Sequence, residues 1–309
     1  AAAAAGANLR LQAVSPASTP DEEGKRQIVL YRLALDDEAL GSEPAAIGAP
    51  SGGLGRTGPW AAPLLRSELA VEAGDLPDAV AQLLATPPPE ASAVGAGPAP
   101  GQGHLAGPGP VVDVLICTHG RRDTCCGSKG TELVASLIAT PLGVAPLGPR
   151  PLAAEGAGGP RPELRLWRTS HTGGHRFAPT AIVLPDGTLW AWATPGLIAQ
   201  VAGRSGDLSD LLPNFRGSAC LGSADHQALE RAVLAEVGWD LLTSRRLALD
   251  VGGGRARLET EHFGSWEAVV REGRRVPQPD CRTDPREATK FGVEWVVEGL
   301  KLVGEALHS

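Results

Sequence analysis

Two pairs of side chains near the middle of the sequence can bind a metal. Cys117 and Cys126 are separated by eight residues, and His171 and His175 are separated by three. Each pair closely follows an apolar run that is typical of a β-strand, so each pair is expected in the loop where a strand ends. Thiolate sulfur and imidazole nitrogen are the ligands of structural zinc and of some iron–sulfur clusters. Metal binding is therefore the first chemistry that these residues suggest.

The spacing within the pairs bears on which metal they suit. Two thiolates and two imidazoles satisfy either a structural Zn²⁺ or a [2Fe–2S] cluster with two thiolates on one iron and two imidazoles on the other. Zinc sites usually take their cysteines from a tight turn with about two to four intervening residues, so the eight-residue spacing favours the larger iron–sulfur core. Gly173 and Gly174 lie between the histidines, and each costs roughly 1 kcal/mol in a helix, so a loop is expected there. Zinc remains the alternative.

The two motifs resemble a known family. The residues 117–127 read Cys-Thr-His-Gly-Arg-Arg-Asp-Thr-Cys-Cys-Gly, and the residues 170–179 read Ser-His-Thr-Gly-Gly-His-Arg-Phe-Ala-Pro. Together with the following segment 183–190, they resemble the sucrase/ferredoxin-like proteins, and a weaker similarity returns at 274–281. The resemblance implies a thioredoxin-like [2Fe–2S] ferredoxin domain over roughly 111–220. It also implies the cluster ligands, which are Cys117, Cys126, His171 and His175.

Such a cluster predicts a role in electron transfer. Replacing two thiolates with two neutral imidazoles makes the core less negative, so it should accept an electron more easily than a four-cysteine ferredoxin cluster. We expect a one-electron carrier rather than a catalyst with its own substrate. It would work with a redox protein partner or as a subunit of a larger redox complex.

Charged residues beside the two loops allow two interpretations. Arg121, Arg122 and Arg176 would add positive potential near a cluster and favour an acidic partner. They could equally be solvated charges, or pair with Asp113 and Asp123.

The remaining cysteines leave other functions open. Cys125 adjoins Cys126 and could replace it as a ligand, whereas Cys220 and Cys281 are expected to be small hydrophobic residues or exposed thiols. A thiol oxidoreductase using Cys125, Cys126 or Cys117 is one alternative, although the usual C-x-x-C motif is absent. The other is a zinc-stabilised or cluster-free interaction scaffold with a thioredoxin-like fold. No carboxylate pair for glycoside hydrolysis stands out.

Composition and charge exclude several partners. The chain has 309 residues and a net charge of −7, so it offers no basic stripe for nucleic acid. No apolar stretch approaches the roughly 20 residues that cross a bilayer. Five cysteines, an odd number, do not form a secreted disulfide framework. A soluble protein of a reducing compartment is expected, in the cytoplasm or in an organelle matrix or stroma.

The pattern along the chain predicts an α/β fold in four parts. These are an N-terminal α/β region (1–86), an Ala/Gly/Pro-rich linker (87–110), the thioredoxin-like ferredoxin domain (111–240) and a C-terminal antiparallel β extension (241–309). Strands are expected at 26–33, 111–116, 164–167, 180–184 and 189–193, and helices at 75–84, 129–140 and 223–237. The C-terminal part should contain three antiparallel strands at 247–251, 256–260 and 266–270. The apolar segment 293–302 suits either a strand or a short helix.

Overall fold

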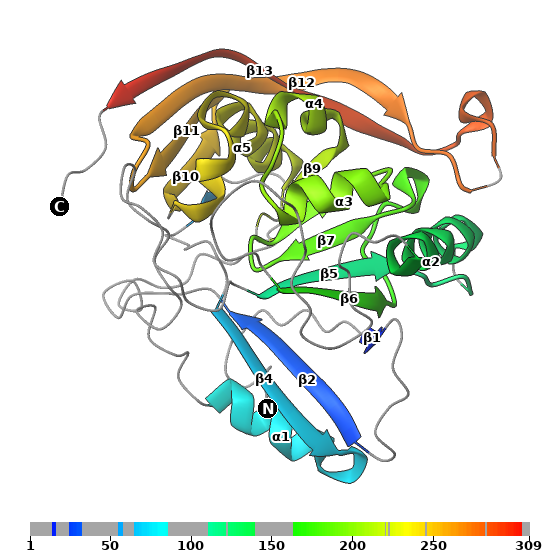
Figure 1. Cartoon of the computed structure of the whole chain (residues 1–309). Helices are drawn as coiled ribbons and strands as arrows, with labels where there is room; N and C mark the ends of the chain where they lie inside the picture. The colour runs from blue at the N-terminus through cyan, green and yellow to red at the C-terminus, as the bar shows by residue number, and fades with distance from the viewer. Residues whose placement is uncertain are drawn as a thin grey trace.

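The computed structural model describes a central sheet, a long C-terminal sheet and a smaller hairpin (Figure 1). The described residues are 14–16, 25–32, 55–57, 65–85, 111–121, 123–139, 163–219, 221, 223–244, 246–281 and 283–304. The expected linker at 87–110 and Cys220 lie outside them. No helix in these ranges combines the length and apolar character needed to span a bilayer.

The central sheet is mixed and has six strands in the order β1-β6-β5-β7-β8-β9. The strand β1 (Val14–Pro16) lies at one edge of the sheet. The other five strands are β5 (Val111–Cys117), β6 (Glu163–Thr169), β7 (Ala181–Leu184), β8 (Thr188–Trp190) and β9 (Phe215–Ser218). Only β5 and β6 run parallel, and all other neighbours are antiparallel. The expected hairpin between β7 and β8 is present.

Three helices cover one face of this sheet, and their apolar side chains form the main core with it. They are α2 (Thr131–Ala139), α3 (Pro195–Ala202) and α5 (Ala224–Val237). β5 supplies Val112, Val114 and Ile116 to this core, because alternate residues of a strand point to the same face. A short helix, α4 (Leu208–Leu211), also contributes. The predicted helices at 129–140 and 223–237 correspond to α2 and α5.

The opposite face of the sheet receives the N-terminal hairpin. β2 (Lys25–Arg32) pairs with β4 (Leu65–Glu72), and α1 (Leu76–Ala85) follows β4. Val29 and Tyr31 pack against a second apolar cluster that includes Leu115 and Trp167. The hydroxyl of Tyr31 and the indole N–H of Trp167 both hydrogen-bond the buried carboxylate of Asp113. β5 is therefore buried on both faces, as its sequence, apolar apart from Asp113, indicates.

The C-terminal sheet is antiparallel, as expected, but larger than three strands. Its order is β13-β12-β11-β10-β3, and its strands are β3 (Gly55–Thr57), β10 (Arg246–Gly252), β11 (Arg255–Thr260), β12 (Ser265–Pro277) and β13 (Phe291–Gly304). The ambiguous segment 293–302 lies within strand β13. Leu249, Leu258 and Val270 of this sheet join the main core beside α5.

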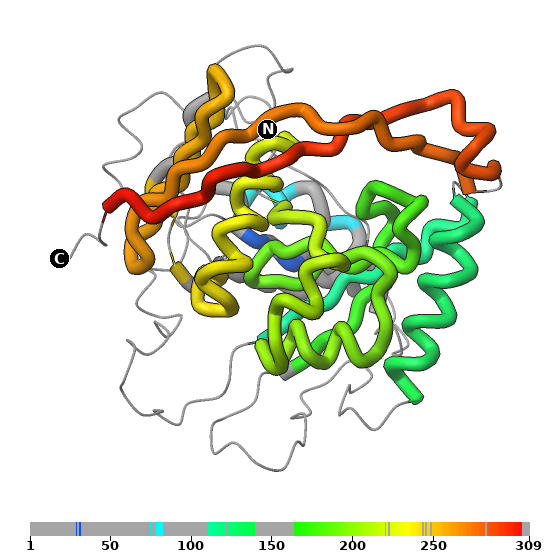
Figure 2. The backbone as a smooth tube through the Cα atoms, turned by 90° about the horizontal axis from the view of Figure 1, so that it is seen from above, coloured from blue at the N-terminus to red at the C-terminus, as the bar shows by residue number. Residues whose placement is uncertain are grey.

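β12 and β13 form a hairpin that extends well beyond the rest of the C-terminal sheet. Figures 1 and 2 show it running across the helical side of the molecule to the beginning of the α2 region. The tip of this hairpin, residues 278–290, contains Cys281 and a short 3-10 helix, Pro285–Glu287. The hairpin therefore brings a cysteine from near the C-terminus to the loop that follows β5.

Candidate metal centre

The parallel pairing of β5 and β6 brings the two predicted ligand loops together. Cys117, the last residue of β5, stands opposite Thr169, the last residue of β6. The carboxyl ends of parallel neighbours lie at the same edge of a sheet, so the loops after these strands must adjoin. Backbone hydrogen bonds from Cys117 N to the Thr180 carbonyl and from Thr118 N to the Thr169 carbonyl, both 3.2 Å, fix this edge.

The loop after β5 folds back so that Cys126 returns to Cys117. It continues into a single π-helical turn, Cys126–Gly130, which leads into α2. A Cβ atom on Gly130 would lie 2.0 Å from the carbonyl oxygen of Cys117, far inside van der Waals contact. A glycine is therefore required at position 130 for the turn to approach the end of β5. π-Helical turns occur often at functional sites.

Cys117 and Cys126 form a buried, hydrogen-bonded thiol pair. Their relative exposures are 1% and 2%, and with Ala178 they form a small separate cluster. The hydrogen bond from Cys126 is the main reason that the pKa of Cys117 falls from 9.0 to about 5, against the effect of burial, which raises it. Backbone groups of His119 and Thr172 and the charge of His171 lower it further. The same hydrogen bond, followed by burial, raises the pKa of Cys126.

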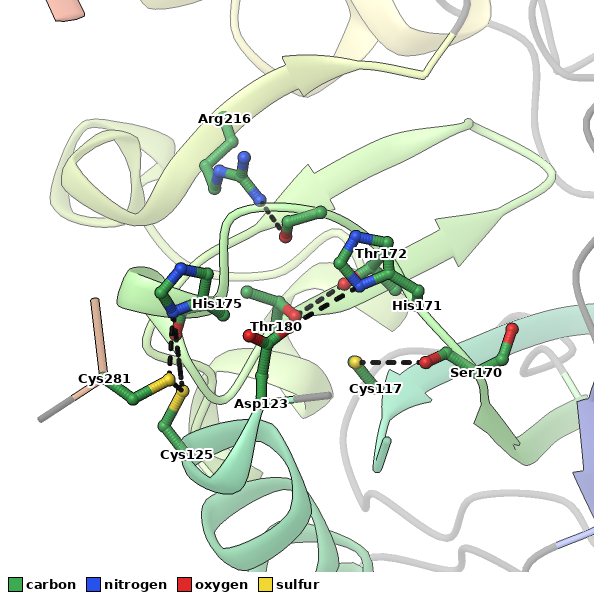
Figure 3. Close-up of polar contacts among 11 residues, drawn as sticks. Cys117, Asp123, Cys125, Ser170, His171, Thr172, His175, Thr180, Arg216 and Cys281 are labelled. Carbon is green, nitrogen blue, oxygen red and sulfur yellow. Dashed lines mark hydrogen bonds and ion pairs between the residues drawn. The ribbon is translucent and has the colours of Figure 1, made fainter. Parts of the chain in front are cut away.

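This pair is prepared for metal binding because one of its sulfurs is ionised at neutral pH. The thiolate is the form of cysteine that binds a metal, and a low pKa reduces the cost of releasing the proton. The sulfur of Cys117 also lies 3.9 Å from the carbonyl oxygen of Ser170, the residue before His171 (Figure 3).

His171 offers an imidazole nitrogen that has no hydrogen-bond partner among the described residues. Its Nδ1 atom is buried and lies 4.0 Å from the carboxylate of Asp123, too far for a hydrogen bond. The neighbouring Thr172 hydroxyl is held by Thr180, with 2.6 Å between the two oxygens. Buried polar atoms are normally paired, so this nitrogen is available to bind a metal.

His175 lies in a different group of ligands. It opens a short 3-10 helix, His175–Phe177, after Gly174, whose φ is 66°. Its Nδ1 atom is 3.0 Å from the Cys281 sulfur and 3.8 Å from the Cys125 sulfur, and the two sulfurs are 2.7 Å apart (Figure 3). The ligand atoms of Cys125, His175 and Cys281 all lie within 4.8 Å of one another, so these three residues form a candidate Cys/His metal site.

The structure thus distributes the four predicted ligands over two adjoining groups. Cys117 and Cys126 are together, and the charge of His171 acts on Cys117, whereas His175 contacts Cys125 and Cys281. The proposed set of four ligands stays a prediction. Cys281 was expected to be a hydrophobic residue or an exposed thiol; it is exposed, and it also reaches this site. No spacing motif marks it, because only the long β12–β13 hairpin brings it there.

Two arginines, Arg176 and Arg216, lie beside the histidine loop and pack against an aromatic ring. The guanidinium groups of Arg176 and Arg216 are 4.4 Å and 4.8 Å from the centre of the Phe177 ring. Burial lowers the pKa of both, and the charge of Arg176 lowers that of Arg216 further. Within the described part of the chain, neither forms an ion pair. Arg216 instead donates to the Gly173 carbonyl oxygen at 3.2 Å.

Comparison with known proteins agrees with the resemblance in the sequence. The sequence profile of the sucrase/ferredoxin-like family matches residues 62–216, which include β5 to β8 and both ligand loops and end within β9. No matching curated protein and no matching solved structure was found.

Proposed function

Because the chain belongs to the sucrase/ferredoxin-like family, we propose that it is a one-electron transfer protein. The cofactor of this proposal is a [2Fe–2S] cluster, and the domain that holds it, 111–240, has a thioredoxin-like fold. The cluster ligands are Cys117, Cys126, His171 and His175.

The observation that carries this proposal is the meeting of the two strand-end loops at one edge of the sheet. The buried Cys117–Cys126 pair supplies two sulfurs, one of them with a low pKa. His171, in the adjoining loop, supplies a ring nitrogen that makes no hydrogen bond within the described part of the chain. These three residues fit a cluster site by their chemistry and by the edge that they share.

The fourth ligand requires a local rearrangement. The imidazole of His175 now faces Cys125 and Cys281, so it would have to leave these sulfurs to join the other three ligands. Gly173 and Gly174, with φ values of 83° and 66°, precede it. Glycine is the residue most tolerant of backbone change, so the loop can adjust at these two positions.

When bound, a [2Fe–2S] cluster takes up and releases one electron. The protein's own residues set how readily this occurs. Two neutral imidazoles leave less negative charge on the cluster than two further thiolates would, and the positive charges of Arg176 and Arg216 act in the same direction. Both effects should raise the reduction potential.

The partner that suits this surface is an acidic redox protein, alone or within a larger complex. Arg176 and Arg216 have no ion-pair partner among the described residues, and Trp192, 49% exposed, contacts Phe177 edge-on at 5.3 Å between ring centres. Guanidinium groups beside a partly buried ring and an exposed indole attract a negatively charged surface. Replacing Arg176 with Gln should lower the potential of the cluster and slow reduction by an acidic donor.

The test is spectroscopy on the purified protein after iron and sulfide have been supplied. A visible absorption band and an electron paramagnetic resonance signal on reduction are expected. His171→Cys and His175→Cys should each keep a cluster and lower its potential, because a thiolate replaces a neutral imidazole. His262→Cys is the matched control, since His262 lies far along the chain on an exposed turn, and it should leave the potential unchanged. A cluster whose reduction potential is the same in both variants as in the wild-type protein would contradict the assignment.

A zinc-stabilised scaffold is the second candidate, and the Cys125–His175–Cys281 group favours it. Two thiolates and one imidazole make three of the four ligands of a zinc site. A colourless protein that holds one equivalent of zinc and loses it in the His175→Ala or Cys281→Ser variant would support this role over electron transfer.

A further inference from the structure

We propose that Cys125 and Cys281 form a reversible disulfide that fastens the tip of the β12–β13 hairpin to the loop after β5. This redox link does not rest on the proposed cluster, because it requires only the two thiols and an oxidant. It joins residues 156 positions apart in the sequence.

The sulfur atoms of Cys125 and Cys281 lie unusually close together. The two sulfurs are 2.7 Å apart, closer than two sulfurs in van der Waals contact and not far from a bond of about 2.05 Å. Two thiolates on one tetrahedral Zn²⁺, each about 2.3 Å from the metal, lie on the order of 3.8 Å apart. The separation in this protein is well below that value, so the pair is arranged more nearly for a bond than for a shared metal.

Solvent reaches Cys125 and Cys281 but not the buried cysteine pair. Cys281 is exposed and Cys125 is partly exposed, so a small oxidant can reach both. Cys117 and Cys126 are 1% and 2% exposed and face each other inside the protein. A soluble disulfide should therefore oxidise Cys125 and Cys281 and leave Cys117 and Cys126, which the proposed cluster needs, as thiols.

Cys281 lies at the free end of a long hairpin. The tip of the β12–β13 hairpin meets the ligand loops through Cys281, which contacts Cys125 and the imidazole of His175 (Figure 3). The other end of the hairpin is anchored in the C-terminal sheet, where Trp266 and Val270 adjoin or enter the main core. A bond at Cys281 would therefore fix the free end of an arm whose base is already held.

The oxidant that we consider is a low-molecular-weight disulfide such as oxidised glutathione. The Cys281 sulfur attacks one sulfur of this disulfide, which breaks the glutathione S–S bond and releases the first glutathione. Cys125 then attacks the mixed disulfide at Cys281 and releases the second glutathione. The protein loses two S–H bonds and gains one S–S bond, and the two released glutathione thiols carry away the two protons and two electrons.

The bond would change the surroundings of His175. Both sulfurs that contact its Nδ1 atom are thiols in the reduced state and become one disulfide in the oxidised state. A disulfide sulfur neither donates a hydrogen bond nor binds zinc as a thiolate does. Oxidation should thus remove the candidate metal site formed by Cys125, His175 and Cys281.

The experiment is disulfide mapping of the full-length protein, free of iron and zinc, in a glutathione redox buffer. Oxidation should lower the number of free thiols by two from the five cysteines of the chain, and a reductant should restore them. Peptide mass spectrometry without reduction should find the fragment containing Cys125 joined to that containing Cys281. Cys125→Ser and Cys281→Ser should each abolish the link, and Cys220→Ser, the matched control, should keep it.

Tryptic cleavage provides a further measurement. Trypsin should cut the tip after Arg286, whose side chain is 92% exposed, more slowly in the oxidised protein than in the Cys281→Ser variant. A link between other cysteines, or separate glutathione adducts on Cys125 and Cys281 without a bond between them, would overturn the proposal. These results are independent of cluster formation, so failure of the disulfide and failure of the electron-transfer role are distinguishable.

Discussion

Removing the hydrogen bond between Cys126 and Cys117 should change the ionisation of the buried pair. In the folded protein the pKa of Cys117 is lowered from 9.0 to about 5, and the hydrogen bond from Cys126 is the largest cause. At pH 7, a thiol with a pKa of about 5 is ~99% thiolate, whereas one with the ordinary value is ~1% thiolate. Cys126→Ala deletes the donor and should move the midpoint upward within this interval.

The assay is absorbance of the thiolate near 240 nm as a function of pH, on protein free of metal. The wild-type protein should show a step of one thiolate near pH 5, and Cys117→Ser should abolish that step. Cys126→Ser keeps a hydroxyl that can donate to sulfur, so its step should lie lower than that of Cys126→Ala. Because the pKa of Cys126 is raised, its thiol contributes no thiolate absorbance near pH 5, so replacing it does not reduce the size of this step. An acidic step that survives unchanged in Cys126→Ala would refute the reasoning.

The lowered pKa of Cys117 also makes the stability of the protein depend on pH. Between pH 5 and pH 9, folded Cys117 is ionised while the unfolded residue still holds its proton. The unfolded state then binds more protons, so this group's contribution to the free energy of unfolding grows as the pH rises and is lost as the pH falls through about 5. Above pH 9 the raised pKa of Cys126 acts in the opposite direction, so the combined benefit of the pair should stop increasing there.

Two other changes test the parts that hold the site in place. Gly130→Ala would put a Cβ 2.0 Å from the Cys117 carbonyl oxygen, so it should destabilise the protein by roughly 1–3 kcal/mol and impair cluster binding. The loss of stability is measured by urea unfolding. Gly196→Ala is the control, because its added Cβ has no neighbour closer than 3.9 Å. Arg246→Met would leave the buried carboxylate of Glu230 without its ion-pair partner at 3.0 Å. It should lower the free energy of unfolding by about 3–5 kcal/mol in the same assay. A decrease below about 1 kcal/mol would contradict the importance of this ion pair.

The elements nearest the ligand loops could be predicted from sequence because their signals are local. An apolar run ending at Cys117, an apolar stripe over 129–140 and a Pro-Asp-Gly turn each depend on a few adjacent residues. A helix beginning at Pro195 was missed, although Thr194 and Pro195 form a recognisable start: the Thr194 hydroxyl accepts a hydrogen bond from Leu197 N at 3.1 Å.

The contacts that the sequence could not reveal are long-range. β3, only three residues long, joins a sheet whose other strands begin at Arg246. The segment 293–302 remained ambiguous because its apolar residues fit either period, and its pairing with β12 makes it a strand. The role of Cys281 depends on the length of that same hairpin. Pairing of strands across such distances is set by tertiary packing, which local propensity does not contain.

The doubled cysteine at 125 and 126 shows how one loop can serve two sites. The sequence left open which of the two would join Cys117, because both lie at nearly the same separation from it. Successive residues of a helix are rotated by about 100° around its axis, so adjacent side chains must point in different directions. Cys126 accordingly faces inward to Cys117, and Cys125 faces the hairpin tip, where it meets Cys281 and His175. Exchanging the two environments would require turning the start of the helix, which Gly130 holds against the end of β5. The local helical geometry therefore separates a buried pair suited to binding a cluster from an accessible pair suited to oxidation, and His175 lies where the two can influence each other.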